Sequence, residues 1–125
     1  MGIKIITNNS KVRDMFSENY NLEYLDTDYI GVLKKIRDMV HLGFKLYTHP
    51  LSGSIKPNET PYKSVIVSDT CKGLDFESLE IIESSIRVAE KFLKDRATPN
   101  WLDKAKEDFK EIDYSIIDDA LKIRG

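Results

Sequence analysis

The sequence predicts an α/β fold: a single three-layer domain with a mostly parallel, Rossmann-like sheet of four strands and a helical C-terminal part. Two observations predict it. Short apolar runs alternate with segments of helical periodicity in the first half of the chain, as in parallel sheets with helical crossovers. The second half carries its apolar residues only at helical spacing. The length of 125 residues fits one domain. We therefore assign residues 1–125 to it, with the sheet in about 1–74 and the helices in about 75–125.

Four short apolar runs are predicted to be strands: residues 3–7, 22–25, 44–48 and 64–68. Between the first two, apolar residues recur at helical spacing after Asn9 or Ser10, either of which can cap a helix. A second helix is expected from about residue 28, within a cluster of Asp and Thr, to Gly43. Glycine is the residue that most easily adopts the left-handed conformation at a helix end.

The second half is predicted to be almost entirely helical. Asp75 is a good helix N-cap, and the apolar stripe that follows it continues towards Pro99, which ends the helix. Trp101 and Phe109 share one face of the next helix, and Asp113 is expected to cap a last helix. The C-terminal part therefore adds helices and no strands.

The composition excludes several classes of protein. Lys and Arg total 19 and Asp and Glu total 21, a net charge of −2, whereas a dedicated nucleic-acid binder usually has a basic excess. We expect neither a nucleic-acid partner nor a membrane partner, since no apolar stretch has the length of a transmembrane helix. Cys71 is the single cysteine, which excludes an internal disulfide. Together with the lack of a signal-peptide pattern, it indicates a cytoplasmic protein.

The charge is unevenly distributed along the chain. Residues 75–125 carry a net charge of −4, and residues 1–74 carry a net charge of +2. A positive sheet-bearing half mildly favours an anionic ligand there. Helix surfaces rich in Glu produce the same difference without any ligand, so both interpretations stay open.

The segment from Thr48 to Lys63 is the most informative part of the sequence. It holds three prolines, which restrict its path, and Gly53 lies between two serines. Loops of this length without secondary structure are usually functional in a compact domain. The segment lacks the Gly-Lys-Ser/Thr ending of nucleotide-hydrolase loops, and the chain lacks the G-x-G-x-x-G fingerprint of dinucleotide folds. We favour a functional loop over a rigid connection between two strands.

Candidate ligand-binding residues follow from the rule that ligands bind beyond the carboxyl ends of strands in open α/β sheets. The first strand ends at two asparagines, which can donate amide hydrogen bonds. The third ends in the proline-rich segment, where Ser-Gly-Ser can present backbone N–H groups to an oxyanion. The residues predicted to line a small-anion site are Asn8, Asn9, Ser10, His49, Ser52, Gly53, Ser54 and Lys56.

Catalysis is the weaker alternative. His49 can act as a general base, with Ser52 or Cys71 as the nucleophile. His49 and Cys71 can meet only if the third and fourth strands are parallel, and an orienting carboxylate would have to come from Asp69 or Glu59. Two histidines and one cysteine without ligand spacing do not make a zinc site. We therefore expect no metal and no cofactor.

Three stretches of the chain resemble the GrdX family: Ile5–Asn9, Thr48–Ser64 and Leu74–Glu83. The likeness extends over most of the chain and weakens beyond about Leu93. Proteins of this family are encoded beside the genes of the glycine, sarcosine and betaine reductases of amino-acid-fermenting anaerobes. The resemblance therefore implies a cytoplasmic accessory protein of that selenium-dependent reductive pathway. It implies no reaction and no catalytic residues.

Three functions stay open. We favour an accessory protein that binds a small anion. The alternative is an interaction protein that docks on a component of glycine, betaine or sarcosine reductase, or on a second copy of itself as a homodimer, through its C-terminal helices. The apolar residues available for such docking are Trp101, Phe109, Ile116, Ile117 and Leu121. A small enzyme built on His49 is the third.

Overall fold

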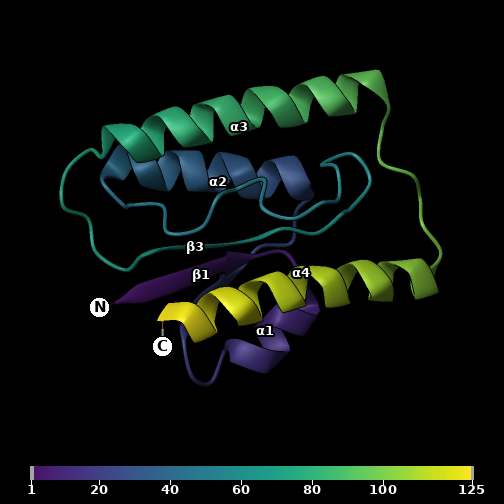
Figure 1. The fold of residues 1–125 in the computed structure, drawn as a ribbon, viewed down its shortest axis with the longest axis horizontal. Helices are drawn as coiled ribbons and strands as arrows, with labels where there is room; N and C mark the ends of the chain where they lie inside the picture. The colour runs from purple at the N-terminus through teal and green to yellow at the C-terminus, as the bar shows by residue number, and fades with distance from the viewer. Residues whose placement is uncertain (1, 125) are drawn as a thin grey trace.

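The structure, a computed structural model, describes residues 2–124, apart from the side chain of Arg124. Within these residues it contains three strands and four helices (Figure 1). In chain order they are β1 (Ile3–Thr7), α1 (Ser10–Phe16), β2 (Asn21–Tyr24), α2 (Tyr29–Leu42), β3 (Ser64–Ser68), α3 (Phe76–Asp95) and α4 (Asp103–Arg124). None of the helices in this part of the chain is long and apolar enough to span a membrane.

The sheet of the described residues is mixed, with the strand order β2–β1–β3. β1 is parallel to β2 and antiparallel to β3, where Ile5 lies opposite Ile66. The predicted α/β class is correct. The predicted four-stranded, mostly parallel, Rossmann-like sheet is wrong, because the sheet has three strands and its β1–β3 pair is antiparallel.

The predicted third strand, residues 44–48, lies beside β3 without forming a regular strand. It runs antiparallel to β3 and makes an isolated bridge between Leu46 and Val67. The backbone N–H groups of Tyr47 and Thr48 both donate to the carbonyl oxygen of Ile66, at 2.9 and 3.3 Å. In a regular antiparallel ladder, the hydrogen bonds are spaced along both strands. Because two successive N–H groups donate to the one carbonyl oxygen of Ile66, the regular pairing with β3 ends here.

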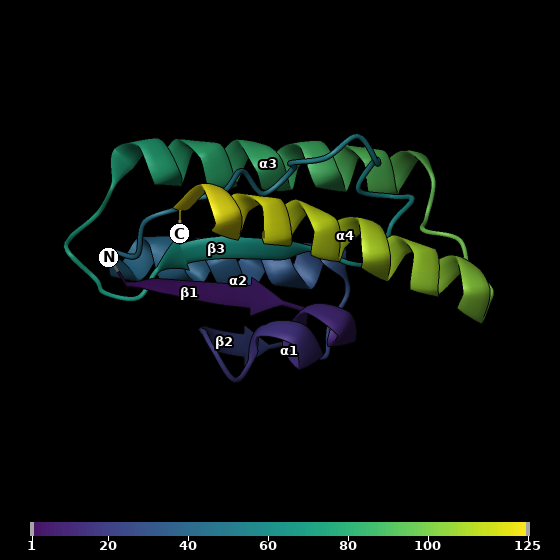
Figure 2. The same ribbon diagram turned by 60° about the horizontal axis from the view of Figure 1, so that its bottom comes forward.

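Helices cover both faces of the sheet (Figure 1). Side chains alternate between the two faces along each strand. Ile6, Val65 and Val67 therefore pack with α2 and α3, whereas Ile5 and Ile66 pack with α1 and α4. All five of these strand side chains are fully buried. Figure 2 shows β2 at the edge of the sheet, next to α1.

Both ends of α2 and the start of α3 follow the capping residues that the sequence predicts. The carboxylate of Asp28 accepts a backbone N–H in the first turn of α2, and that of Asp75 does the same in α3. Gly43 ends α2 with a φ of +108°, in the left-handed region that favours glycine. These signals are local, and for that reason they are readable from the sequence.

The predicted helix start at Asp113 is wrong. α4 runs without interruption from Asp103 to Arg124, and Asp113 is a buried residue in its middle. Its carboxylate accepts hydrogen bonds from Asn9, after the end of β1, and from Ser64, at the start of β3, so it does not act as a helix cap.

The proline-rich segment, residues 48–63, is attached to the helices around it. Asn58 donates two hydrogen bonds at the C-terminal end of α3, to the carbonyl oxygens of Phe92 and Arg96. Trp101, just ahead of α4, donates to a carbonyl group of the segment. Tyr29, at the start of α2, donates to the carbonyl oxygen of Pro50 at 3.2 Å. The segment therefore has a defined path over the end of the sheet.

Candidate functional site

A cluster of buried polar residues lies where β1 ends and β3 begins. Antiparallel pairing places the last residue of β1 opposite the first residue of β3. The polar cluster consists of Thr7, Asn8, Asn9, Lys63, Ser64 and Asp113, each at most 5% exposed. Buried polar groups cost free energy unless they are hydrogen-bonded, so the partners of each group show what holds this cluster together.

The carboxylate of Asp113 is the centre of the polar cluster. Its Oδ1 accepts from the backbone N–H of Ser64 at 3.0 Å. Its Oδ2 accepts from Ser64 Oγ at 2.6 Å and from Asn9 Nδ2 at 3.0 Å. Hydrogen bonds to an ionised acceptor are stronger than neutral ones. The carboxylate thereby joins α4 to the end of β1 and to the start of β3.

The hydroxyl groups of the polar cluster have one consistent orientation. Ser64 Oγ donates to the carboxylate of Asp113, which only accepts when ionised, so Thr7 Oγ1 is the donor in its 2.6 Å contact with Ser64 Oγ. Thr7 Oγ1 in turn accepts from the backbone N–H of Asn9 at 2.9 Å. A directed chain of hydrogen bonds therefore runs from the backbone of Asn9 to Asp113.

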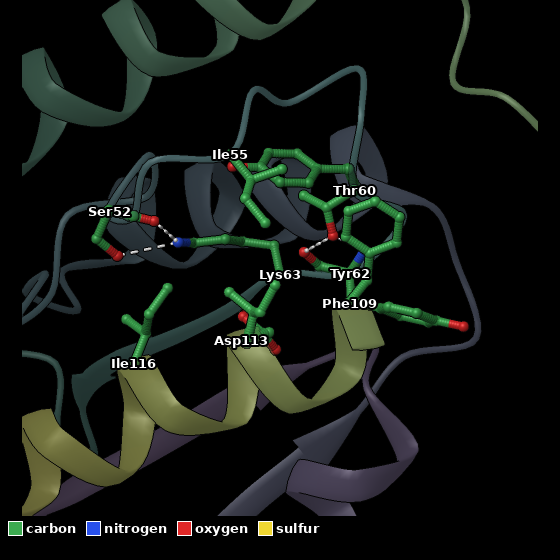
Figure 3. A pocket seen from close by; sticks show the side chains of 11 residues that line it. Ser52, Ile55, Thr60, Tyr62, Lys63, Phe109, Asp113 and Ile116 are labelled. Atoms are coloured by element: carbon green, nitrogen blue, oxygen red, sulfur yellow. Dashed lines mark hydrogen bonds between the residues drawn. The ribbon is translucent and has the colours of Figure 1, made fainter. Parts of the chain in front are cut away.

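Lys63 brings a positive charge into the polar cluster. Its Nζ donates to the carbonyl oxygen and to Oγ of Ser52, both at 2.9 Å (Figure 3). The described residues accept from two of its three N–H groups, and no carboxylate among them forms an ion pair with it. Burial lowers the pKa of Lys63 from 10.5 to about 8, and the negative charge of Asp113 opposes this shift.

A small cavity lies against the Lys63 side chain, between the proline-rich segment and α4 (Figure 3). Its volume is about 20 Å³, on the order of one ordered water molecule or small ion. It is lined by Tyr29, Ser52, Gly53, Ile55, Thr60, Tyr62, Lys63, Phe109, Ile112, Asp113 and Ile116. Gly53 and Ile112 are exposed, so the cavity reaches the surface of the molecule.

The structure places two of the predicted ligand residues, Ser52 and Gly53, at this cavity. Ser52 accepts both hydrogen bonds of Lys63. Gly53 has a φ of +104°, and a Cβ atom there would approach Cδ1 of Ile116 to 2.7 Å. The segment can therefore pass closely over α4 at this point because residue 53 has no side chain.

Asn8 and Asn9 use their side chains inside the protein. Nδ2 of Asn8 donates to two backbone carbonyls, one of them that of Pro61, and Oδ1 accepts from the backbone N–H of Lys63. Nδ2 of Asn9 donates to Asp113 and to a backbone carbonyl of α4, and Oδ1 caps α1. Each amide hydrogen has a protein acceptor. The two side chains therefore hold the proline-rich segment and α4 against the end of β1.

The other predicted ligand residues do not line the cavity beside Lys63. Ser10 begins α1 and borders a separate surface depression that also includes Asp26 and Asp28. Ser54 and Lys56 are exposed on the proline-rich segment.

His49 and Cys71 are not brought together. Residues 44–48 run antiparallel to β3, so His49 lies beyond one end of the pairing and Cys71 beyond the other. Nδ1 of His49 accepts from the backbone N–H of Leu51 at 3.0 Å. Within residues 2–124 the His49 ring has no carboxylate or thiol partner, and no group of three or more His, Cys, Asp and Glu is arranged to hold a metal ion.

Lys63 and Asp113 are the residues of this site that the sequence analysis missed. Lys63 is spaced at i, i+2 and i+4 with two valines of β3, which places it on a buried face of the sheet. Asp113 lies four residues after Phe109 and four before Ile117, within an apolar helical stripe. A charged residue inside an apolar pattern was the signal in both cases.

Comparison with known proteins identifies a family. A sequence model of the family described as GrdX-like protein matches residues 4–122. No curated protein and no solved structure matches the chain. The matched range includes the whole polar cluster and the proline-rich segment, so the match covers this site as well as the fold.

Proposed function

Because the chain belongs to the GrdX-like family, we propose that it is a cytoplasmic accessory protein of the glycine reductase system and binds a small anion at Lys63. Membership in this family suggests the association with the reductase system. The observation that supports the ligand is the buried ammonium of Lys63, which borders a cavity and forms no ion pair with the described residues. The physiological partners would be components of glycine, betaine or sarcosine reductase.

The electrostatic environment of Lys63 favours an anion. A buried ion without an opposite charge in contact costs several kcal/mol of desolvation, and the lowered pKa of Lys63 has this cause. The nearby carboxylate of Asp113 is already occupied by Ser64 and Asn9. An anion in the cavity would supply the missing charge and raise the pKa of Lys63. Binding near pH 8 would therefore be accompanied by proton uptake.

The size of the cavity limits the class of anion. A volume of about 20 Å³ is on the order of one ordered water molecule, so it can take at most the charged end of a small anion, and it does not fit a nucleotide. The remainder of a larger ligand would have to leave through the opening at Gly53 and Ile112. Acetate is therefore the first probe, and phosphate is the second.

The test is calorimetric titration of the protein with acetate and with phosphate at about pH 8, in two buffers of different ionisation enthalpy. We expect millimolar or tighter binding of at least one anion, with proton uptake. Lys63→Met is expected to abolish it, while Lys56→Met, which removes an exposed charge of the same segment, leaves it unchanged. Circular dichroism confirms that each variant is folded. No heat of binding for either anion at tens of millimolar would refute the ligand proposal.

A second candidate function is docking through α4. Leu102, just ahead of α4, and Ile123, in its last turn, are 81% and 87% exposed. The residues first considered for docking are mostly used internally. Ile117 and Leu121 are buried in the core, and the ring of Trp101 packs against that of Phe109 at an interplanar angle of 49°. Light scattering of the wild type and of a Leu102→Ser/Ile123→Ser variant tests self-association. A monomer at all concentrations, with no reductase component recovered by co-purification, would argue against this role.

A further inference from the structure

We infer that Lys63 is also an amine nucleophile, which forms a Schiff base with a small aldehyde in the cavity shown in Figure 3. The inference rests on the same cavity as the proposed anion binding, and it adds a class of carbonyl ligand. Three features carry it: the burial of the amine, its position at the cavity, and the hydroxyl group beside it.

Burial changes the protonation of Lys63. An amine attacks a carbonyl carbon only in its neutral form, and an ordinary lysine is almost fully protonated at neutral pH. The pKa of Lys63 is lowered to about 8. The neutral fraction at pH 7 is therefore roughly 300-fold larger than that of an exposed lysine. Desolvation of this kind is an established way to activate a lysine nucleophile.

The position of Nζ brings the amine to the reacting space. The Lys63 side chain crosses the cavity towards Ser52, and apolar side chains from the proline-rich segment and α4 lie on either side of it (Figure 3). These walls limit access of water, which hydrolyses Schiff bases. The volume of about 20 Å³ can take at most the formyl group of a small aldehyde, and the rest of the molecule would lie at the exposed rim formed by Gly53 and Ile112.

Ser52 provides both a proton acceptor and a proton donor beside the amine. Its Oγ lies 2.9 Å from Nζ, and a hydroxyl group can do both. Tyr29 also lines the cavity, and burial raises the pKa of its phenol, so this group stays neutral. The dehydration step needs a proton at the departing oxygen, and Ser52 is placed to relay it.

The chemical step is balanced without a further reactant. The lone pair of Nζ forms a bond to the aldehyde carbon, and the carbonyl oxygen takes up a proton to give a carbinolamine. The C–O bond then breaks, and the oxygen leaves as water. Overall, one ammonium group and one aldehyde give one iminium group and one water molecule. The positive charge stays at Nζ, and the iminium N–H can still donate to the carbonyl oxygen of Ser52.

The test is reductive trapping of the full chain with glyoxylate, the smallest aldehyde that also carries a carboxylate, and cyanoborohydride at pH 7. Peptide mass mapping then locates the resulting carboxymethyl-lysine. We expect Lys63 to be labelled at least tenfold faster than the exposed Lys56 and Lys72. Ser52→Ala is expected to slow labelling of Lys63 alone, and Lys63→Arg, which keeps the charge, abolishes the fast phase.

The outcomes separate this inference from the proposed anion binding. Equal labelling of all lysines, or a Lys63 that stays unlabelled while Lys56 and Lys72 react, overturns the Schiff-base inference even if acetate binds. Fast labelling of Lys63 in a protein that binds neither acetate nor phosphate supports this inference and refutes the anion proposal. The labelling map of the wild type decides between these results, so the conclusion does not depend on a variant that fails to fold.

Discussion

The two ends of the β1–β3 pair carry polar residues of similar type in opposite environments. At one end lies the polar cluster around Asp113, whose members are almost completely buried. At the other end, residues 69–74 form an exposed turn that includes Cys71 and Lys72. The sequence places both stretches directly after strands. Side-chain hydrogen bonds join the first to separate segments of the chain. The turn is attached by the backbone N–H groups of Asp69 and Lys72, which donate to the carbonyl oxygens of Gly2 and Gly43.

This difference shows that burial, more than residue type, distinguishes a hydrogen-bonded polar site inside the protein from a solvent-exposed turn. A thiol, a lysine and an aspartate in the exposed turn are free to interact with water. The lysine and the aspartate of the polar cluster persist only because their partners offset the loss of water. Substitutions should therefore have large effects at the buried end of the pair and small effects at the exposed end.

The largest effect is expected from Asp113→Ala. Removal of the carboxylate leaves the backbone N–H and the hydroxyl of Ser64 and one amide hydrogen of Asn9 without their acceptor. We expect a loss of about 3–5 kcal/mol in the free energy of unfolding, measured by urea denaturation. The control is Asp119→Ala on the exposed side of α4, which should change stability by less than about 0.5 kcal/mol. Equal effects of the two would contradict the central role of Asp113.

Asn9→Ala should destabilise the protein by about 2 kcal/mol, since it removes the cap of α1 and a bond to Asp113. The same denaturation experiment measures it, with the exposed Asn19→Ala as the control. Together with Asp113→Ala, the combined loss should be smaller than the sum by at least about 0.5 kcal/mol, because both variants break the same bond. Strict additivity would show that the two residues act independently.

The pH dependence of stability should identify the buried charge of Lys63. Its pKa is about 8 in the folded protein and 10.5 in the ordinary state, so the unfolded chain binds more protons between these values. The free energy of unfolding therefore rises with pH in this window, by about 2 kcal/mol up to pH 9.5. Tyr29, whose pKa is raised by burial, has the opposite effect, but only above about pH 10.

Urea denaturation at pH 7 and pH 9.5 measures this rise, with Lys63→Met as the reference that lacks the titrating group. The wild type should gain about 2 kcal/mol relative to the variant between the two pH values. Parallel pH profiles of the two proteins would mean that Lys63 is not desolvated in solution.

The smallest effect is expected from Cys71→Ala at the exposed end. The thiol is exposed, so the free energy of unfolding should change by less than about 0.5 kcal/mol. Thiol titration of the native wild type should find one accessible sulfhydryl group. A loss above 1 kcal/mol would show that the exposed turn is also a built structure and would remove the contrast between the two ends.

The features predicted correctly from the sequence are those set by neighbouring residues. The start of α2 at Asp28 and its end at Gly43 depend on capping within one helical turn. The start of α3 at Asp75 depends on the same effect. The direction of β3, in contrast, is not set by neighbouring residues. A long segment before a strand is compatible with a parallel crossover and with an antiparallel return, and the choice depends on where residues 48–63 are attached.

The missed residues depend on partners distant in the sequence. Aspartate favours helix N-caps, and on this ground Asp113 was interpreted as a local signal. Its actual partners, Ser64 and Asn9, lie 49 and 104 positions away. In the sequence, Lys63 resembles an ordinary loop lysine. Its special environment, made by Ser52 and the other residues that line the cavity, is visible only in the structure. The prediction that Ser52 and Gly53 take part in a ligand site remains to be tested by the titrations above.

The wide spacing of the groups around Asp113 also has a consequence for how the molecule is made. As the chain leaves the ribosome, the strands and the first helices can emerge while the groups of Asn9 and Ser64 that donate to Asp113 still have only water as an acceptor. α4 completes the arrangement, and it is synthesised after both partners of Asp113. A nascent chain stalled before α4 should therefore remain open to proteases and chaperones at the end of β1, and it should become resistant only after Asp113 has been released and its helix has packed against the sheet.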